Sequence, residues 1–274
     1  MIPPNPLKLK QTHYKAFINL VKHNMQYAGA IRLDHSFSLM RLFWVDKNKN
    51  GAYINYNLKD MTAILCLESH KNKCIVIGED LGNVPDGFPE FMLKHKILSN
   101  KILFRQKDKD GKFLQIDKYP YLSLCQVSTH DQATSYGFWL NEDININNAC
   151  HLFPKQSQYK NNLKERDNER KDIFHIMKKT SSFCNNKDSF QNCLDGKTAP
   201  FNLEYSFNIY GAKTESAIFQ VKMADIYQQI EMENVPSTVD EYPNWRIKYP
   251  VLTEDIAKDE RMKNLFFALK KYRK

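Results

Sequence analysis

Three carboxylates each follow a short apolar run of the chain, and this repeated placement is where the sequence first indicates chemistry. Asp34 closes the segment AIRLDH, Glu79 follows the apolar CIVIG, and Asp131 closes QVSTHD. A parallel α/β barrel builds its active site at the carboxyl ends of its strands, where these side chains would stand. Three such carboxylates suggest glycosidic chemistry. One attacks the anomeric carbon, one moves a proton to and from the bridging oxygen, and one stabilises the positive charge that develops on the sugar.

The elements that must position these carboxylates alternate between helix and strand. Helical spacing of apolar residues predicts a helix that Thr12 caps and Gly29 ends, and a second one around Leu58–Leu65. Phe88–His95 is predicted to be a short helix. The expected strands are Ala30–Asp34, Cys74–Glu79, Lys101–Phe104, Leu122–Thr129 and Ala217–Met223. Because crossovers that include helices join them, we expect the five strands to pair in parallel.

The second half of the chain is expected to add two helical segments. Residues 141–214 carry the polar, charged stretch Lys155–Lys171 and are predicted to form a helical excursion between the last two strands. The stretch from Thr253 to Tyr272 has one apolar face, made of Met262, Leu265, Phe266 and Leu269. This pattern predicts a C-terminal helix that packs on the outside of the sheet.

Longer strings around the three carboxylates resemble one enzyme family. They are GAIRLDHSFSLMRLFWV, GAYINYNLKDMTAILCLESHKNKCIVIGEDLGNVPDGF, ILSNKILF, VSTHDQATSYGFW and ENVPSTVDEYPNWRIKYP. In this order and at this spacing, from about Asn5 to Pro250, they are similar to the 4-alpha-glucanotransferases, also called amylomaltases or disproportionating enzymes. The resemblance implies transfer of α-1,4-glucan segments (maltooligosaccharides) to glucose or another glucan by a retaining double displacement, with no cofactor and no metal.

The same resemblance implies a role for each carboxylate. Asp34 would be the nucleophile that forms a covalent glucosyl enzyme, Glu79 the general acid/base, and Asp131 the third carboxylate, which binds sugar hydroxyls and favours the distorted ring. His130 would contact the sugar in the subsite to the left of the cleaved bond. Arg32 stands two residues before Asp34, so on a strand the two side chains share a face, and the guanidinium can hold the carboxylate ionised.

Three more residues are candidates for contact with the sugar. His35 follows the proposed nucleophile, and Asp80 follows the proposed acid/base, although an acid after a strand often caps the next helix. Trp44, like Tyr53 and Tyr56, could stack on a sugar face or could pack near the barrel rim.

A turn after the last expected strand also resembles the family. Asn234, Pro236 and Thr238 match its Asn-Val-Pro-Gly-Thr turn, but this chain has Ser237 where the family has glycine. A serine fits such a turn unless the backbone requires a positive φ, which glycine adopts at little cost.

The family order of the motifs implies that the chain holds only part of a barrel. In the family the nucleophile lies on the fourth strand, the acid/base on the fifth and the third acid on the seventh, whereas here the nucleophile stands at position 34. The expected fold is therefore α/β, a partial TIM (β/α)8 barrel of about strands four to eight with helical insertions, and residues 1–274 form its C-terminal part. Two readings stay open. The chain is one half of a split enzyme that pairs with an N-terminal fragment, or it is a catalytically inactive glucan-binding remnant.

Composition bears on the other partners. The 274 residues carry a formal net charge of +9, with a pI near 9.1, which raises nucleic-acid binding as an alternative. The lysines are scattered or lie on expected helix faces, and no RRM, KH or zinc-finger pattern accompanies them, so no nucleic acid is expected. No apolar run approaches the ~20 residues that span a bilayer, and the first ten residues lack an apolar signal core. No membrane partner is therefore expected, and the cytoplasm is the default compartment.

The cysteines indicate neither disulfides nor a metal site. Six of them, at positions 66, 74, 125, 150, 184 and 193, form no C-x-x-C pair, and three lie in or beside apolar runs. Free buried thiols explain this pattern better than disulfides do. His175, Cys184 and Cys193 have a spacing that fits no standard zinc arrangement, so we expect no metal there.

Overall fold

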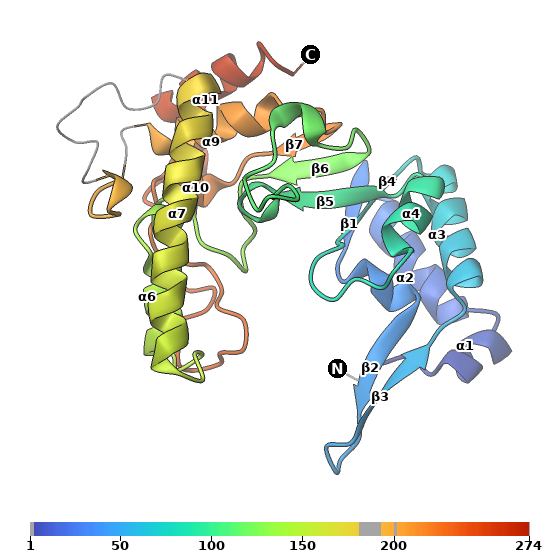
Figure 1. Ribbon diagram of the computed structural model, residues 1–274. Coiled ribbons are helices and arrows are strands. Elements are labelled where there is room, and N and C mark those ends of the chain that lie inside the picture. The colour runs from blue at the N-terminus through green and yellow to red at the C-terminus, as the bar shows by residue number, and fades with distance from the viewer. Residues whose placement is uncertain (1–2, 181–192, 200–201, 274) are drawn as a thin grey trace. The chain divides into compact units, whose positions relative to one another are not determined.

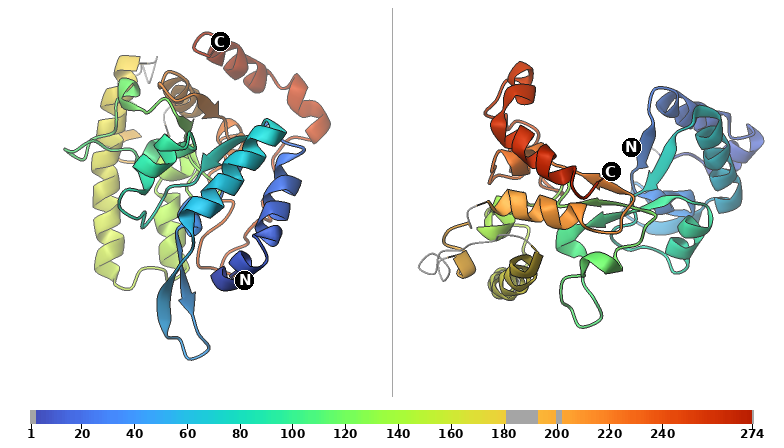
Figure 2. Two further views of the ribbon diagram at one scale, coloured as in Figure 1. Left: turned by 90° about the vertical axis from the view of Figure 1, so that its right-hand side faces the viewer. Right: turned by 90° about the horizontal axis from the view of Figure 1, so that it is seen from above.

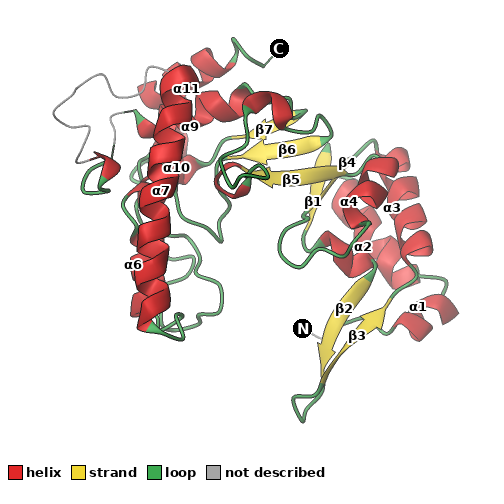
Figure 3. Cartoon of the chain, in the orientation of Figure 1, coloured by secondary structure: helices red, strands yellow, loops and turns green. Residues whose placement is uncertain are grey.

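The computed structural model describes residues 3–180, 193–199 and 202–273, and Figures 1 and 3 show its elements. Five strands form one sheet in the order β1-β4-β5-β6-β7, in which β1 pairs in parallel with β4, and β4 with β5. They are β1 (Ala30–Leu33), β4 (Ile75–Gly78), β5 (Leu98–Ile102), β6 (Ser123–Gln126) and β7 (Ile218–Gln220). The chain divides into two compact units, Met1–Asn100 with Leu122–Leu124, and Lys101–Tyr121 with Cys125–Lys274.

The third strand of the sheet begins earlier than its sequence predicts. β5 runs over Leu98–Ile102, and Leu103–Arg105 form a 3-10 turn, η2, instead of continuing the expected strand. Along β5 the side chains of Leu98, Asn100 and Ile102 are buried and the two between them are half-buried. The apolar run Ile102–Phe104, on which the predicted strand was based, therefore lies at the end of β5 and in the 3-10 turn that follows it.

Helices and strands of the first unit share one apolar core. α2 (Lys15–Met25) contacts α3 (Leu58–Asn72), and α4 (Phe88–Lys94) packs beside them. The core includes Val21, Met25, Met61, Leu65, Val76, Phe88 and Met92. Burial of each large apolar side chain contributes about 1.5–3 kcal/mol to folding, so this cluster is what holds β1 and β4 in place.

The prediction that Thr12 caps the helix before β1 is wrong. A short helix, α1 (Pro6–Gln11), precedes that helix, and Thr12 lies at the C-terminal end of α1, where its hydroxyl donates to the Lys8 carbonyl. The side chain of Asn5 caps α1 by accepting two backbone N–H groups, and Pro6 occupies its first position. Tyr14 then begins α2 in the left-handed region, without a side-chain cap. Asn at the N-cap followed by Pro at the first helical position is a typical start of a helix, so the sequence did contain the signal for α1.

A β-hairpin follows the 3-10 turn η1 (Ser36–Leu39) and was not expected. β2 (Arg41–Val45) pairs antiparallel with β3 (Gly51–Asn55), and the hairpin extends away from the helices of its unit (Figures 1 and 2). Asp46 accepts the backbone N–H groups of Asn48 and Asn50, both at 2.8 Å, and these bonds hold the turn. The pKa of the Asp46 carboxyl is lowered, chiefly by the hydrogen bond that it accepts from the Asn50 backbone.

The second unit is mainly helical. After β6 come α5 (Ser135–Trp139), α6 (Glu142–Ala149), the long α7 (Gln156–Thr180) and α9 (Leu203–Ala212), and Figure 2 shows α7 as one continuous helix. Trp139, Ile173, Met177, Leu203 and Phe207 are buried in one core that joins α5, α7 and α9. Residues 181–192 and 200–201 of the expected excursion lie outside the described residues.

The C-terminal helix packs on another helix, α9, and the apolar cluster that the two form also includes the half-buried Phe219 of the sheet strand β7. It is shorter than predicted, because Thr253–Lys258 form the 3-10 helix η4 and α11 spans only Glu260–Leu269, capped by the side chain of Asp259. The buried side chains of α11 contact α9 and α10 (Met223–Ile226) in one cluster, while Phe266 is 44% exposed. Nearly every residue of α9 is buried, so this apolar helix needs a cover that α11 supplies.

The described cysteines are free thiols, and Cys184 lies outside the described residues. Burial raises the pKa of the Cys125 thiol to about 12, which makes it an inert core group. Within the described part of the chain no three His, Cys, Asp or Glu side chains are placed to hold a metal ion. Among the same residues no helix has the length and apolar character that crossing a membrane requires.

Candidate active site

Asp34 is the first residue beyond β1 and forms an ion pair with Arg32. The Arg32 Nη1 atom lies 2.6 Å from Asp34 Oδ1, so the two side chains share one face of the strand end, as their spacing predicts. The Asp34 side chain is 78% exposed. Its carboxylate therefore stands in the open with one oxygen bonded to a cation.

Glu79 follows β4 and is held by backbone donors from both sides. The His35 N–H donates to Glu79 Oε2 at 2.6 Å, and the Leu81 N–H donates to Oε1 at 3.3 Å. The Glu79 N–H in turn donates to the Leu33 carbonyl at 2.9 Å. With only 8% of its surface exposed, Glu79 is fixed against the end of β1.

The pairing register brings these two acids to adjacent strand ends. β1 and β4 pair in parallel with Leu33 opposite Gly78, so Asp34 and Glu79 are the next residues of neighbouring strands. Neighbouring strands lie about 4.8 Å apart. The register therefore places the two acids next to each other at the same edge of the sheet.

Ser36 bonds the backbone of Glu79, and Gly78 leaves the space that Ser36 needs. The Ser36 hydroxyl and the Ser36 N–H both donate to the Glu79 carbonyl, at 2.7 and 2.9 Å, and Ser36 is 1% exposed. Gly78 passes so close that an added Cβ would stand 2.7 Å from Met92 Cε and 3.0 Å from Ser36 Oγ. A methyl group at position 78 would move the end of the Met92 side chain and crowd the serine that bonds Glu79.

We therefore expect Gly78→Ala to lower the free energy of unfolding by about 1–3 kcal/mol, as overpacking does in cores. Urea unfolding followed by circular dichroism measures it. Gly29→Ala is the matched control, because nothing lies within 4 Å of a Cβ there. That control should leave stability unchanged or raise it by up to about 1 kcal/mol. Equal effects of the two substitutions would contradict the packing argument.

His35 and Asp80 both make contacts within the protein. The His35 backbone lies in the left-handed region at φ 49°, and its ring centroid lies 4.0 Å from that of Phe37. Asp80 Oδ1 accepts the N–H of Asn100 at 2.8 Å, which ties the end of β4 to β5. Asp80 caps no helix, since the next one, α4, begins eight residues later with Gly87 at its N-cap.

Asp131 and His130 follow β6 in the second unit and are held by the segment around Asn234. The Asn234 amide donates to Asp131 Oδ1 at 2.6 Å, and its backbone N–H donates to the His130 carbonyl at 3.2 Å. His130 Nε2 lies 3.3 Å from Asp131 Oδ2, and the Trp245 ring lies 5.2 Å from the His130 ring. Both side chains are a little over 40% exposed, so they can reach a ligand.

Comparison with known proteins decides the family. The sequence model of glycoside hydrolase family 77, described as 4-alpha-glucanotransferase, matches residues 2–253. This chain belongs to the 4-alpha-glucanotransferase family. The 4-alpha-glucanotransferase of Haemophilus influenzae is 29% identical over 269 residues, and that of Mycobacterium bovis 27% identical over 285 residues. The expected resemblance is confirmed.

These relatives are much longer than this chain. The alignments cover 97% and 98% of the chain but only 38% and 37% of the Haemophilus influenzae and Mycobacterium bovis proteins. The crystal structure of amylomaltase from Corynebacterium glutamicum superposes with a TM-score of 0.82 at 24% identity, covering 96% of this chain and 39% of that one. This likeness confirms the α/β fold of a partial TIM barrel.

The family's turn after the last strand carries a strained residue in this chain. Ser237 has φ 71°, in the left-handed region where glycine is favoured. Its neighbours fix that conformation, because Asn244 Oδ1 accepts the Val235 N–H at 2.8 Å and the Thr238 hydroxyl donates to the Val235 carbonyl at 2.8 Å. The backbone of this turn therefore requires a positive φ at position 237, where serine is less favourable than glycine.

Ser237→Gly should raise the free energy of unfolding by about 1 kcal/mol, because a non-glycine residue in the left-handed region costs about 1–3 kcal/mol and glycine loses part of that gain in chain entropy. Thermal and urea unfolding measure the change. Ser157→Gly is the opposite-sign control, since Ser157 is exposed in the first turn of α7 and glycine weakens a helix by about 0.5–1 kcal/mol. Destabilisation by Ser237→Gly would show that the strain is absent.

A cluster of charged residues contacts the loop that carries Asp131, and the sequence analysis did not predict it. Lys222 donates to the Thr129 carbonyl at 2.9 Å and pairs with Glu233 at 3.1 Å, and Glu233 also accepts the Tyr249 hydroxyl at 2.6 Å. The wholly buried Asp225 accepts the Ser135 N–H at 2.6 Å, and burial raises its pKa. Lys222 follows an apolar strand just as the three carboxylates do, so the same signal could have found it.

The aromatic candidates differ in burial. Trp44 packs against the apolar core of the first unit, and Tyr56 is 8% exposed with its hydroxyl donating to the Pro4 carbonyl at 2.8 Å. Tyr53, on β3, is 53% exposed and lies beneath the Arg41 guanidinium. Trp44 is half-buried, and Tyr53 is the most exposed of the three rings.

Proposed function

We propose that this chain carries the catalytic carboxylates of a retaining 4-alpha-glucanotransferase, which transfers segments of α-1,4-glucan to glucose or to another glucan. The observation that carries the proposal is the placement of Asp34 and Glu79 at the ends of paired parallel strands. Arg32 bonds the first acid and two backbone N–H groups bond the second. Asp131 is the third acid, on the strand end that β6 supplies.

In the first step Asp34 attacks the anomeric carbon while Glu79 protonates the bridging oxygen. The bond from that carbon to the leaving glucan breaks, and a glucosyl ester of Asp34 forms. Glu79 Oε1 suits the proton transfer better than Oε2, because its bond to the backbone, at 3.3 Å, is the weaker of the two. The short bond from His35 to Oε2 fixes the direction of the carboxyl group.

In the second step the 4-hydroxyl of an acceptor sugar displaces Asp34. Glu79, now ionised, takes the hydroxyl proton, and the glycosidic bond that forms has the original configuration. Asp131 binds sugar hydroxyls, while Asn234 occupies one of its oxygens and sets its orientation. His130 contacts the sugar from the adjoining position. His35, Asp80 and Trp44 are further candidates for contact with the sugar, besides the structural contacts that they make.

The sheet offers places for further strands. Among the described residues β1 pairs only with β4, and β7 only with β6. Unpaired strand edges bind other strands or aggregate, and closing a barrel removes them. We propose that an N-terminal fragment of the same enzyme, the part of the longer relatives that this chain does not span, pairs with these edges.

The test is disproportionation of maltotriose, followed by glucose release. The purified chain should be oligomeric or prone to aggregation and should release no glucose by itself. Adding a polypeptide that supplies the N-terminal strands, for example that part of the Haemophilus influenzae relative, should restore solubility and turnover. A monodisperse monomer that turns over maltotriose unaided would contradict the need for a fragment.

A catalytically inactive glucan-binding remnant is the second candidate. The observation that favours it is the 78% exposure of Asp34, because transfer to a sugar and not to water requires a site that excludes water. This candidate predicts that the complemented protein binds maltooligosaccharides and still releases no glucose. Turnover in the complemented protein would eliminate it.

A further inference from the structure

We propose that Lys222 is a positioning residue for the third acid of the site. Its ammonium group joins the loop that carries Asp131, residues 127–134 between β6 and α5, to the segment that carries Asn234. Lys222 follows β7, and only 10% of its side chain is exposed. The inference rests on the proposed function, since it concerns how Asp131 is held for its role with the sugar.

The ammonium group of Lys222 spends its three donors on these two segments. It lies 2.9 Å from the Thr129 carbonyl and 3.5 Å from Ser128 Oγ, both in the loop. Its third partner is Glu233 Oε2, at 3.1 Å, in the segment beside Asn234. An ammonium group has three protons and no acceptor, and leaving it unpaired away from water is costly. Lys222 is thus a cross-link between two segments that lie far apart in the sequence.

The two cross-linked segments meet again at the carboxylate of Asp131. Thr129 stands two residues before this acid. Glu233 is the neighbour of Asn234, whose amide donates to Asp131 Oδ1 at 2.6 Å. Glu233 is itself fixed, because it accepts the Tyr249 hydroxyl at 2.6 Å. A shift of Glu233 away from Thr129 would therefore move the amide of Asn234 relative to the carboxylate that it bonds.

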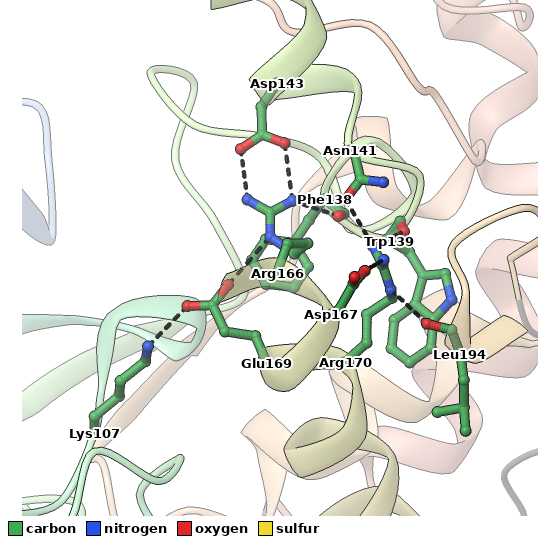
Figure 4. A network of polar contacts seen from close by, with 10 residues as sticks. All are labelled: Lys107, Phe138, Trp139, Asn141, Asp143, Arg166, Asp167, Glu169, Arg170 and Leu194. Carbon is green, nitrogen blue, oxygen red and sulfur yellow. Dashed lines mark hydrogen bonds and ion pairs between the residues drawn. The ribbon is translucent and has the colours of Figure 1, made fainter. Parts of the chain in front are cut away.

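The other end of the loop is fixed by different bonds. It leads into α5, where Arg170 of α7 donates to the Trp139 carbonyl at 3.0 Å (Figure 4). Arg166, also of α7, stacks over the Phe138 ring with its Cζ 3.7 Å from the centroid. These contacts hold α5 without Lys222. The effect of Lys222 is therefore expected at the strand end of the loop, where Asp131 stands.

Charge balance is the alternative role for Lys222. Asp225 is wholly buried three residues further along the chain. Burial raises the pKa of its carboxyl, the Lys222 ammonium lowers that pKa, and the Glu233 carboxylate raises it. Removing Lys222 would leave these two acids near each other without this cation. A loss of stability is therefore expected from either role, and the test must follow the loop itself.

The first measurement is hydrogen–deuterium exchange, followed by mass spectrometry, of the full 274-residue chain with and without the N-terminal fragment. The N–H groups of Asp131 and Gln132 both donate to Thr129. In Lys222→Met they should exchange about tenfold faster or more, because loss of a charged hydrogen bond favours local opening. Amides of α5 should exchange as in the wild type. Lys263→Met, the same change in an exposed ion pair of α11, is the matched control and should leave the loop unchanged.

The double variant Lys222→Met/Glu233→Gln separates positioning from charge balance. It removes the cation together with one of the acids, so its urea midpoint should return toward that of the wild type. The loop amides should still exchange about tenfold faster, because the Thr129 carbonyl has lost its charged donor. If the single variant fails to fold, the double variant carries the same expectation for the loop.

The second measurement is turnover of maltotriose by the complemented protein. Both Lys222 variants should lower kcat by about 10–100-fold, the cost of a slightly misplaced group, and should change KM by less than about threefold. A loss in kcat alone is expected because Asp131 is assigned to the distorted ring, whose contacts strengthen in the transition state. Lys263→Met should retain full activity.

The inference is overturned if loop exchange in Lys222→Met matches the wild type, or if the double variant restores loop exchange together with stability. It is also overturned if the wild type turns over maltotriose and the Lys222 variants keep its kcat. Its failure is distinguishable from failure of the proposed function, because exchange requires no turnover. Faster exchange confined to the loop, in a complemented protein that releases no glucose, would support positioning by Lys222 and reject the transferase. Turnover by the wild type with unchanged exchange in the variants would reject the positioning role alone.

Discussion

Asp34→Asn in the complemented protein is expected to abolish disproportionation of maltotriose, with a rate lower by roughly 10⁴-fold or more. An amide cannot form the glycosyl ester, so the first displacement has no nucleophile, and the loss corresponds to about 5 kcal/mol of transition-state stabilisation. Initial rates of glucose release measure it. Activity within tenfold of the wild type would remove Asp34 from the mechanism.

Two controls make this result specific to the chemistry. Because the Arg32–Asp34 pair is exposed, its loss should change the free energy of unfolding by less than about 1 kcal/mol. The urea midpoint of Asp34→Asn should therefore stay near that of the wild type. Asp86→Asn makes the same chemical change at an exposed acid in the loop after β4 and should retain full activity.

Substitution of Glu79 is expected to affect two glucosyl donors, maltotriose and α-glucosyl fluoride, to different extents. Glu79→Gln should lower the rate with maltotriose by roughly 10²–10⁴-fold, since an amide cannot protonate the bridging oxygen. With α-glucosyl fluoride, whose leaving group needs no proton, glycosylation of Asp34 should persist. Single-turnover release of fluoride and mass spectrometry of the glucosylated chain measure this step.

Glutamine is the sharper variant because it keeps the acceptor that Glu79 offers to His35. Its carbonyl oxygen can still accept the His35 N–H, which Glu79 Oε2 now accepts at 2.6 Å, whereas Glu79→Ala leaves that donor without a partner. If only the alanine variant loses activity with the fluoride, the loss comes from a change in the loop after β1, whose His35 N–H has lost its acceptor, and not from the loss of proton transfer. If both variants lose activity equally with both donors, another residue transfers the proton.

The strand ends that carry the acids could be predicted from the sequence because the signal is local. A buried parallel strand is a short apolar run, and a carboxylate that follows it must stand at the carboxyl edge. The spacing of Arg32 and Asp34 likewise predicted their shared face, and the structure shows the ion pair. The start of β5 could not be predicted in this way, since polar Ser99 and Asn100 lie within it. Strand pairing, not local hydrophobicity, decides where that strand begins.

The sequence by itself determined the family, the parallel α/β fold, and the order in which Asp34, Glu79 and Asp131 follow their strands. These properties depend on residue types and on periodicities of a few residues. Only the tertiary structure decided the contacts that Glu79 and Asp131 make with residues distant in the sequence. The Ser36 hydroxyl meets the Glu79 carbonyl, and Asn234 meets Asp131 across 103 residues. It also placed α11 on α9, because a helix packs against whichever apolar surface the rest of the chain leaves uncovered.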